Sequence, residues 1–230
     1  MQAQFWRKGT AKVIITVSPA RHTRSQILIQ RQAEFGKTGQ QFVFVNDKSG
    51  LIQQYRIDTN SHAWQGSLVR SLQLPSQPEG CVADDQTGVL FVGEEDAGIW
   101  RFAAEPDAAV AGEQIILVDG ETLVDDVEGL ALATHGDNQY LIASSQGNDS
   151  YVIYDAAAPY ALRLRFRVST NPQLAIDGSS ETDGLELTTL SLGKGFEQGA
   201  VIVQDGRNRM PEQGQNLKLV PWADILQQLN

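Results

Sequence analysis

The sequence lacks the features that mark several large classes of protein. Its single cysteine, Cys81, allows no internal disulfide and no cysteine-based zinc cluster, and we expect it to be a buried thiol. No apolar run approaches the ~20 residues that a helix needs to span a bilayer, so we expect no membrane-spanning segment. The net charge of −10 disfavours nucleic acid and anionic membrane surfaces as partners. The same charge is compatible with the binding of cations.

Histidine is scarce, and its three copies, His22, His62 and His135, fall in no shared motif. A histidine-phosphatase arrangement is therefore not indicated. Helical periodicity is also almost absent. Only the C-terminal stretch 221–229, with Pro221 at its start, predicts a short helix.

Short apolar stretches separated by turns fill most of the chain and predict an all-β fold. A strand that reads as buried recurs at intervals of about 48, 50 and about 60 residues, each time followed by a strand that carries aromatic residues. Four-stranded units of roughly 40–50 residues are typical of β-propeller blades. We expect three fairly complete blades at 79–118, 128–168 and 183–222 and a partial blade at 41–74, in an incomplete or open propeller. The recurring buried strands lie at 42–45, 90–93, 140–143 and 200–203.

An acidic residue followed by glycine stands at the first strand of three of these units, at Glu79, Glu128 and Asp183. First strands line the channel of a propeller, so the three acids are predicted to converge there. The alternative is that each acid-glycine pair only makes a turn before its strand. Residues 77–102 also hold six acids, which indicates either a hard divalent cation with oxygen ligands or a solvated acidic edge.

Residues 1–36 show no clear periodicity, whereas from residue 37 the sequence has the pattern of short strands. We therefore divide the chain into a divergent N-terminal segment, 1–36, and a propeller domain, 37–230. Residues 13–17 form an apolar stretch after Arg7 and Lys8 that weakly resembles a signal peptide. This stretch is too short for the apolar region of a typical one.

Seven segments follow one another in a fixed order with near-constant spacing, and together they are highly specific. They resemble segments of the calcium-dependent β-propeller phytases, which have six blades, and the resemblance covers about four-fifths of the chain. The segments are 77–85 (QPEGCVADD), 94–102 (EEDAGIWRF), 125–130 (DDVEGL), 143–151 (ASSQGNDSY), 180–185 (SETDGL), 203–206 (VQDG) and 215–222 (QNLKLVPW).

The resemblance implies a 3-phytase-like phosphoric monoester hydrolase that removes phosphate from phytate, myo-inositol hexakisphosphate. Several Ca²⁺ ions would bridge the acidic rim to the polyanionic substrate and activate a water, with no covalent intermediate. It implies that the catalytic calcium cluster is held by Glu79, Glu95, Asp126, Glu128 and Asp183. It also implies structural calcium ligands at Asp177, Asp205 and Asn208, and a phosphate-contacting cation at Lys48, with Arg70 as a weaker candidate.

Phytate or calcium-phytate is the implied partner, and the family resemblance implies a secreted or periplasmic location. Two earlier family segments, of the types Asp-Asp-Pro-Ala and Asn-Asn-Val-Asp, do not occur in this sequence. The alternative function is therefore a truncated, inactive propeller remnant that binds calcium and phosphate. Blades cut from a ring leave apolar faces bare, so we also expect self-association.

Overall fold

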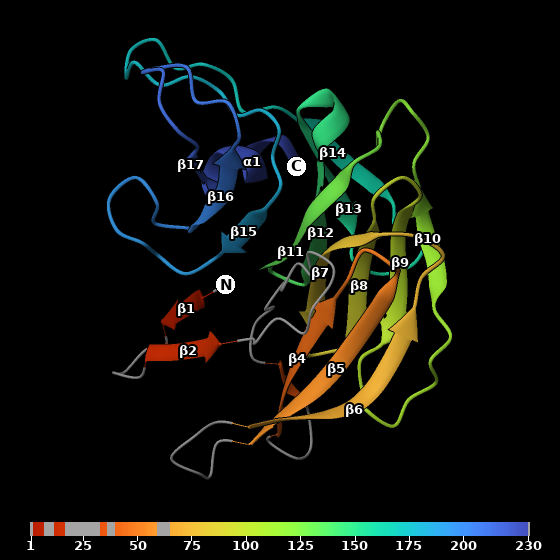
Figure 1. The fold of residues 1–230 in the computed structure, drawn as a ribbon. Helices are drawn as coiled ribbons and strands as arrows, with labels where there is room; N and C mark the ends of the chain where they lie inside the picture. Colours follow the sequence, from red (N-terminus) through yellow and green to blue (C-terminus); the bar gives the residue numbers. More distant parts are fainter. Residues whose placement is uncertain (1, 7–11, 17–32, 36–39, 59–64, 230) are drawn as a thin grey trace.

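The computed structural model describes residues 2–6, 12–16, 33–35, 40–58 and 65–229. Within these residues the regular secondary structure is almost entirely β-strand, which confirms the expected fold class. Four antiparallel sheets follow one another around an arc in chain order (Figure 1). His22 and His62 lie outside the described residues.

Each sheet is a run of strands in which neighbours in sequence pair with each other, as in a propeller blade. The first sheet contains β3 (Ala33–Phe35), β4 (Gln40–Asn46), β5 (Leu51–Asp58) and β6 (Gln65–Gln73). The second contains β7 (Pro78–Asp84), β8 (Val89–Glu94), β9 (Gly98–Ala103) and β10 (Glu113–Leu117). The third contains β11 (Val127–His135), β12 (Asn138–Ser145), β13 (Ser150–Asp155) and β14 (Leu162–Phe166). The fourth contains β15 (Leu185–Thr188), β16 (Ala200–Asp205) and β17 (Asn216–Pro221).

The remaining elements are short. A separate hairpin joins β1 (Gln2–Trp6) to β2 (Lys12–Thr16). A single 3₁₀ turn, η2 (Gln146–Asn148), follows β12. The expected C-terminal helix is present as α1 (Trp222–Leu229). Among the residues that the structure describes, no helix combines the length and the apolar character required to cross a bilayer.

The completeness of the first and last sheets differs from the sequence-based expectation. The unit expected to be partial has four strands, because β3 pairs with β4 through the register Glu34 to Gln41. The expected boundary at residue 37 therefore falls between two strands of one sheet. The unit at 183–222, expected to be fairly complete, has three strands among the described residues. The reason is that the chain passes from β17 directly into α1.

Both faces of the middle sheets are buried, and this explains why their strands read as continuous apolar runs. On β8, Leu90 and Val92 pack against the first sheet, whereas Phe91 packs against the third. On β12, Leu141 packs toward the second sheet and Ile142 toward the fourth. Successive side chains of a strand point to opposite faces, so one run of apolar residues fills two cores.

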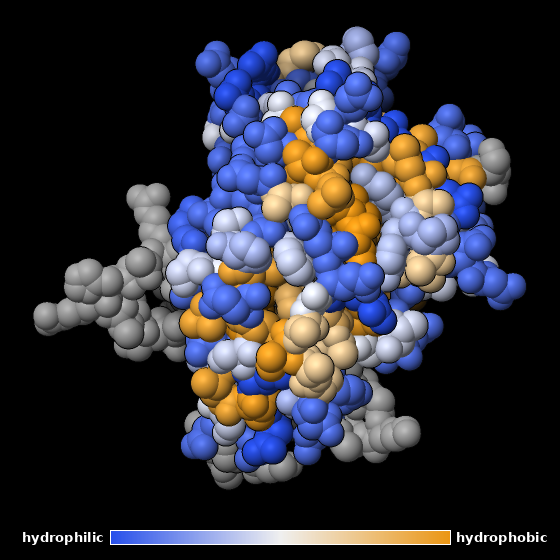
Figure 2. All heavy atoms as spheres, turned by 90° about the vertical axis from the view of Figure 1, so that its right-hand side faces the viewer, coloured by the Kyte–Doolittle hydropathy of each residue, from blue (hydrophilic) through white to orange (hydrophobic). Residues whose placement is uncertain are grey.

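Cys81 lies in the core between the first two sheets, as expected, and is 2% exposed. Burial raises the pKa of its thiol to about 12. The thiol is therefore a packing group. Apolar side chains also gather on the side of the molecule where β10 lies (Figure 2), where Leu117 and Val110 are exposed.

The inner strands of successive sheets approach so closely that only glycine fits between them. A Cβ atom on Gly80 of β7 would lie 2.0 Å from the carbonyl oxygen of Glu128 on β11. A Cβ atom on Gly129 of β11 would lie 2.5 Å from the amide nitrogen of Leu185 on β15. The glycines of the first two acid-glycine pairs, Gly80 and Gly129, thus allow the close approach of two strands, which is a role that the turn interpretation did not include.

The first prediction follows from this close approach. Gly80→Ala should destabilise the protein by about 2 kcal/mol or more, because the new methyl group meets backbone atoms that have no room to move. Gly214→Ala is the matched control, since a Cβ atom there has nothing within 4 Å. Thermal unfolding of both variants tests this, and equal melting temperatures would contradict the tight contact.

Candidate functional site

Three glutamates from two neighbouring sheets meet at one end of the inner strands. Glu79 lies on β7, Glu95 follows the last residue of β8, and Glu128 lies on β11. One carboxylate oxygen of each lies within 4.8 Å of those of the other two. We call these three residues the acidic cluster. The convergence predicted for Glu79 and Glu128 is therefore present.

β-Bulges place the two inner-strand glutamates in this position. Between β7 and β8 the register shifts from Pro78–Glu94 to Cys81–Val92, so that β7 holds one residue more than its partner. The same shift occurs at the start of β11, where Glu128 lies. A bulge bends the strand and changes the direction of its side chains, and bulges are frequent beside active sites.

A backbone hydrogen bond then joins the two sheets at the cluster. The amide of Val127 donates to the carbonyl oxygen of Glu95 at 2.9 Å, which fixes Glu128 beside Glu95. On the other side, Asn46 Nδ2 donates to the carbonyl oxygen of Glu79 at 2.7 Å. The geometry of the cluster is thus determined by contacts between sheets.

Burial and mutual repulsion disfavour the charged forms of all three glutamates. Burial, followed by the charges of Glu79, Asp183 and Glu95, raises the pKa of Glu128 to about 8. Burial also raises the pKa of Glu79, and burial together with the charge of Glu79 raises the pKa of Glu95. Without a counter-charge the cluster is therefore under electrostatic strain.

Within the described part of the chain, two buried oxygen atoms at this cluster have no hydrogen-bond partner, and their chemistry suits a bound cation. They are Glu79 Oε2 and Asn46 Oδ1, and their residues are each 3% exposed. An orphaned buried acceptor is costly unless a donor or a metal ion satisfies it. Hard divalent cations prefer carboxylate and amide oxygens, so the donor set suits such an ion.

The structure brings three further sequence-predicted residues to this rim. The charges of Asp126 and Asp183 raise the pKa of both Glu79 and Glu128, and the charge of Lys48 lowers the pKa of Glu79 and Glu95. Asp126 adopts a positive φ of 35°, which is uncommon for a residue other than glycine. Lys48 is exposed in the turn between β4 and β5, so its ammonium group is available to a ligand.

Arg70, the weaker phosphate candidate, is not part of this rim. It is 7% exposed, and its Nε donates to Gln54 Oε1 at 3.0 Å. Its Nη2 donates to the carbonyl oxygen of Ala103 at 2.8 Å, while Gln54 Nε2 donates to that of Ala104 at 2.9 Å. Its charged neighbours are Glu105 and Asp107. Arg70 therefore joins the first sheet to the second.

The other acids of 77–102 have structural roles or lie in solvent. Glu94 is 2% exposed and accepts hydrogen bonds from Trp100 Nε1 at 2.7 Å and from Ser76 Oγ at 2.6 Å. Asp84 accepts a hydrogen bond from the amide of Gln86 at 2.9 Å and so forms the expected turn before β8. Of the six acids in this stretch, only Glu79 and Glu95 belong to the cluster.

The three residues predicted to bind structural calcium lie together, but around a lysine. Lys218 Nζ lies 2.5 Å from Asp177 Oδ1, 3.1 Å from Asp205 Oδ2 and 3.1 Å from Asn208 Oδ1. The sequence analysis had not connected Lys218 with this site.

A ring of amide side chains around the acids was also missed. Gln77 Nε2 donates to Glu79 Oε1, and Gln146 Nε2 donates to Asp183 Oδ1 at 2.7 Å. Gln204 Oε1 accepts the amide of Asp183 at 2.9 Å. These three glutamines lie inside the seven quoted segments, which is the signal that could have identified them. Asn46 lies outside those segments and had no such signal.

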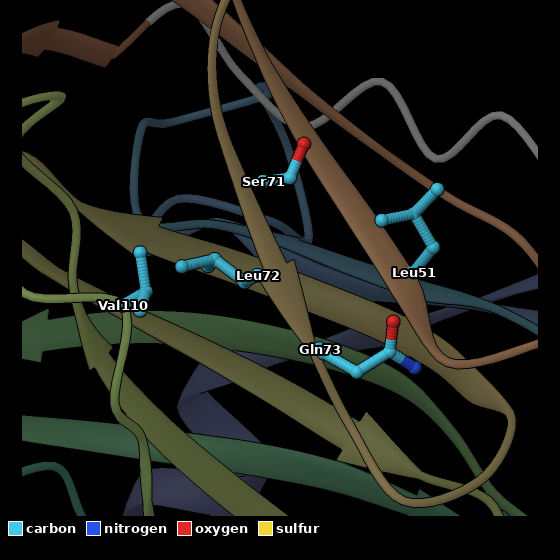
Figure 3. A pocket seen from close by; sticks show the side chains of 5 residues that line it. All are labelled: Leu51, Ser71, Leu72, Gln73 and Val110. Carbon is cyan, nitrogen blue, oxygen red and sulfur yellow. The ribbon is translucent and has the colours of Figure 1, made fainter.

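The most evident hollow among the described residues lies elsewhere. It is lined by Leu51, Ser71, Leu72 and Gln73 of the first sheet and by Val110 from the loop between β9 and β10 (Figure 3). All five are uncharged, so this hollow offers no carboxylate for a metal ion and no counter-charge for an anion. The chemistry points to the rim.

Comparisons with known proteins give one family. The sequence model of the family described as Phytase matches residues 19–230. The chain is 38% identical over 198 residues to a protein of Bacillus subtilis (strain 168) named 3-phytase. This similarity covers 84% of the chain and 51% of the relative, so the chain spans about half the length of the curated relative that it matches.

Solved structures give weaker similarities. One is a chain of the mitotic checkpoint complex, with a TM-score of 0.43 and 12% identity, over 78% of this chain and 50% of that chain. Another is apo AztD from Citrobacter koseri, with a TM-score of 0.38 and 15% identity, over 72% of this chain and 41% of that chain.

The second prediction concerns pH and the raised pKa of Glu128. An unfolded glutamate has a pKa of about 4.3, so between about pH 5 and about pH 8 the folded chain binds more protons than the unfolded chain. In excess chelator the melting temperature should therefore fall as the pH rises through this window. Glu128→Gln should remove much of that fall, because the amide does not ionise. An unchanged pH dependence in this variant would contradict the assignment.

Proposed function

Because the chain belongs to the phytase family, we propose that it acts in the calcium-dependent hydrolysis of phosphomonoesters of phytate. The observation that carries this proposal is the meeting of Glu79, Glu95 and Glu128 at one rim. No two of these residues are adjacent in one strand, so the cluster results from the fold and from its bulges.

Charge explains why this rim needs a cation for such a substrate. Phytate is a dense polyanion, and the rim carries the three clustered glutamates with Asp126 and Asp183 beside them. Two bodies of the same sign repel unless positive charge lies between them. When bound, calcium would neutralise phosphate oxygens and supply an activated water for in-line attack on phosphorus.

The chain's own residues have distinct tasks in this proposal. Glu79, Glu95 and Glu128 hold the ion, with the amide oxygen of Asn46 as a neutral ligand beside Glu79. Lys48 binds a phosphate oxygen of the substrate, because its ammonium is exposed and lies close to the cluster.

Asp126 and Asp183 add negative charge at the edge of the cluster and hold further ions there. Asp183 is oriented for this by Gln146, which donates to its carboxylate, and by Gln204, which accepts its amide. A rim with several carboxylates and few cations of its own depends on bound ions for substrate affinity.

One observation favours a second candidate function. Of the two cations predicted to contact phosphate, only Lys48 acts on the cluster, whereas Arg70 is held between the first two sheets. A propeller remnant that binds calcium and phosphate without turnover would show calcium binding at the same cluster. Release of phosphate separates the two candidates.

A secreted or periplasmic location belongs to the same proposal, since it follows from the family resemblance. Fractionation of cells that express the native gene tests it, and accumulation in the cytoplasm alone would contradict it.

The third prediction concerns catalysis. Glu128→Gln should lower the rate of phosphate release from phytate by roughly 100-fold or more, since loss of even an indirect ligand partner costs about 10–100-fold. The fold should persist, because the amide is nearly isosteric and removes a buried charge. Phosphate release is measured with calcium and with chelator, for the native chain and the variant.

Glu95→Gln should show the same loss, whereas His135→Ala is the matched control. His135 is exposed at the end of β11 farthest from Glu128 and should be silent. Retained activity in both glutamate variants would contradict the assignment of the cluster. A native chain that binds calcium but releases no phosphate would favour the remnant.

The fourth prediction concerns self-association through the last sheet. Leu217 and Leu219 on β17 are 61% and 49% exposed, and both lie on the face opposite the buried Lys218. The middle sheets bury both faces, so this face should bury its leucines against a second copy of the chain. Light scattering should show oligomers of the native chain. The double variant with Leu217→Lys and Leu219→Lys should be monomeric. Leu174→Lys, at an exposed leucine outside the strands, is the control, and a monomeric native chain would refute the idea.

A further inference from the structure

A single lysine occupies the centre of the oxygen-rich site formed by Asp177, Asp205 and Asn208. Lys218 lies on β17, Asp205 ends β16, Asn208 lies in the loop between these strands, and Asp177 lies in the segment before β15. We call these four residues the lysine cage. It connects β16, β17, the loop between them and the segment before β15.

The ammonium group of Lys218 has three oxygen neighbours, two as hydrogen-bond acceptors and one as an ion-pair partner. It donates to Asp177 Oδ1 at 2.5 Å and to Asn208 Oδ1 at 3.1 Å, and it forms an ion pair with Asp205 Oδ2 at 3.1 Å. A lysine ammonium has three donors and no acceptor, so this environment satisfies it.

The cage is buried, so its charged groups need partners of opposite charge within the protein. The side chains of Lys218 and Asp205 are 7% and 1% exposed, and that of Asp177 is 13% exposed. Burial lowers the pKa of Lys218, but its close polar contacts with the two aspartates and their negative charges outweigh burial, so its pKa lies above the ordinary value. The bond from Lys218 in turn lowers the pKa of Asp177.

The remaining oxygen atoms of the cage already have donors. Asp205 Oδ1 accepts the amide of Ser180 at 3.1 Å, and Asp177 Oδ2 accepts the amide of Arg209 at 2.5 Å. Asn208 Oδ1 also accepts Asn216 Nδ2 at 2.9 Å. Calcium takes roughly 6–8 oxygen ligands. The three oxygens that converge in the cage, Asp177 Oδ1, Asp205 Oδ2 and Asn208 Oδ1, instead have the ammonium of Lys218 at their centre. The cage therefore does not fit a divalent ion.

The acidic cluster differs from the cage in this respect. Among the described residues, Asp205 Oδ2 also lacks a hydrogen bond, but it lies 3.1 Å from the ammonium of Lys218. Glu79 Oε2 and Asn46 Oδ1 lack a partner, and Lys48, whose charge acts on Glu79, is exposed. The negative charge of the cage is thus balanced by Lys218, whereas that of the acidic cluster has no buried lysine beside it among the described residues.

We propose that Lys218 is the built-in cation of the cage, and that the chain holds no calcium at Asp177, Asp205 and Asn208. The ammonium group joins β16, β17 and the preceding segment as a structural ion would. It thereby fixes Asp205 and the neighbouring Gln204, whose side chain accepts the amide of Asp183 at the rim.

The test separates the cage from the acidic cluster. Glu79→Gln with Glu128→Gln gives a background in which the cluster is silenced. Calcium chloride is titrated into this background by calorimetry, and its melting temperature is measured in calcium and in chelator. With Lys218 present, we expect the cage to contribute no heat of binding and no shift in melting temperature. Any response to calcium that Asp126 and Asp183 retain at the rim should therefore be unchanged by Asp205→Asn.

Lys218→Ala in the same background should create a calcium site. Removing one partner of a buried pair should lower the melting temperature in chelator by roughly 10 °C. Calcium should restore most of that loss, and adding Asp205→Asn should abolish the restoration. Lys218→Met is the matched control. The methionine side chain fills the space of the lysine, so this variant should be less stable than the background and should not respond to calcium.

Two results would overturn the proposal. One is calcium binding in the background with Lys218 present that Asp205→Asn removes. The other is a Lys218→Ala variant with unchanged stability and no response to calcium. If Lys218→Ala fails to fold, the titration of the background alone decides, because Lys218 is intact there. Neither readout depends on phosphate release.

Discussion

The close approach of the inner strands is the constraint on which the rest of this structure depends. Gly80 and Gly129 bring the backbones of β7, β11 and β15 so near to one another that a methyl group would collide with the next strand. The acids that precede these glycines are carried along, and the bulges direct Glu79 and Glu128 to the same point. The same acid-glycine dipeptide therefore allows the close packing of the strands and brings the negative charges of the cluster together.

The fold balances the resulting negative charge in two ways. At the last sheet a lysine from β17 enters between two aspartates and satisfies them. At the acidic cluster no buried lysine is among the described neighbours, burial raises the pKa of all three glutamates, and acceptor atoms remain unpaired. A group of carboxylates left in this state is stable as a set of anions only when it binds a cation. The contrast between the two sites is what makes the cluster the functional candidate.

The sheets also depend on one another, because neighbouring sheets bury their apolar faces against each other. The middle sheets bury apolar residues on both sides, so each depends on its two neighbours for stability. At the last sheet the series changes, since a Cβ atom on Gly184 would have nothing within 4 Å, whereas the equivalent atoms on Gly80 and Gly129 would collide. Leu217 and Leu219 are exposed on the same sheet. The sheets are thus equivalent in strand order but differ in what covers them.

Much of this protein follows from its sequence alone. The recurring apolar stretches determined the all-β blades, because continuous apolar runs need two buried faces, and Pro221 with the residues after it determined α1. The acid-glycine pairs were sufficient to place Glu79 and Glu128 at one rim. Tertiary structure decided what local patterns do not encode. Arg70 lies on an alternating strand, which suggests exposure, yet Gln54 and the carbonyl oxygen of Ala103 hold it inside. Lys218 is separated by 41 residues from Asp177, and only the pairing of β16 with β17 brings its ammonium between the aspartates. Spacing in sequence determines which residues share a strand, whereas the partner of a buried charge depends on which strands the fold places side by side.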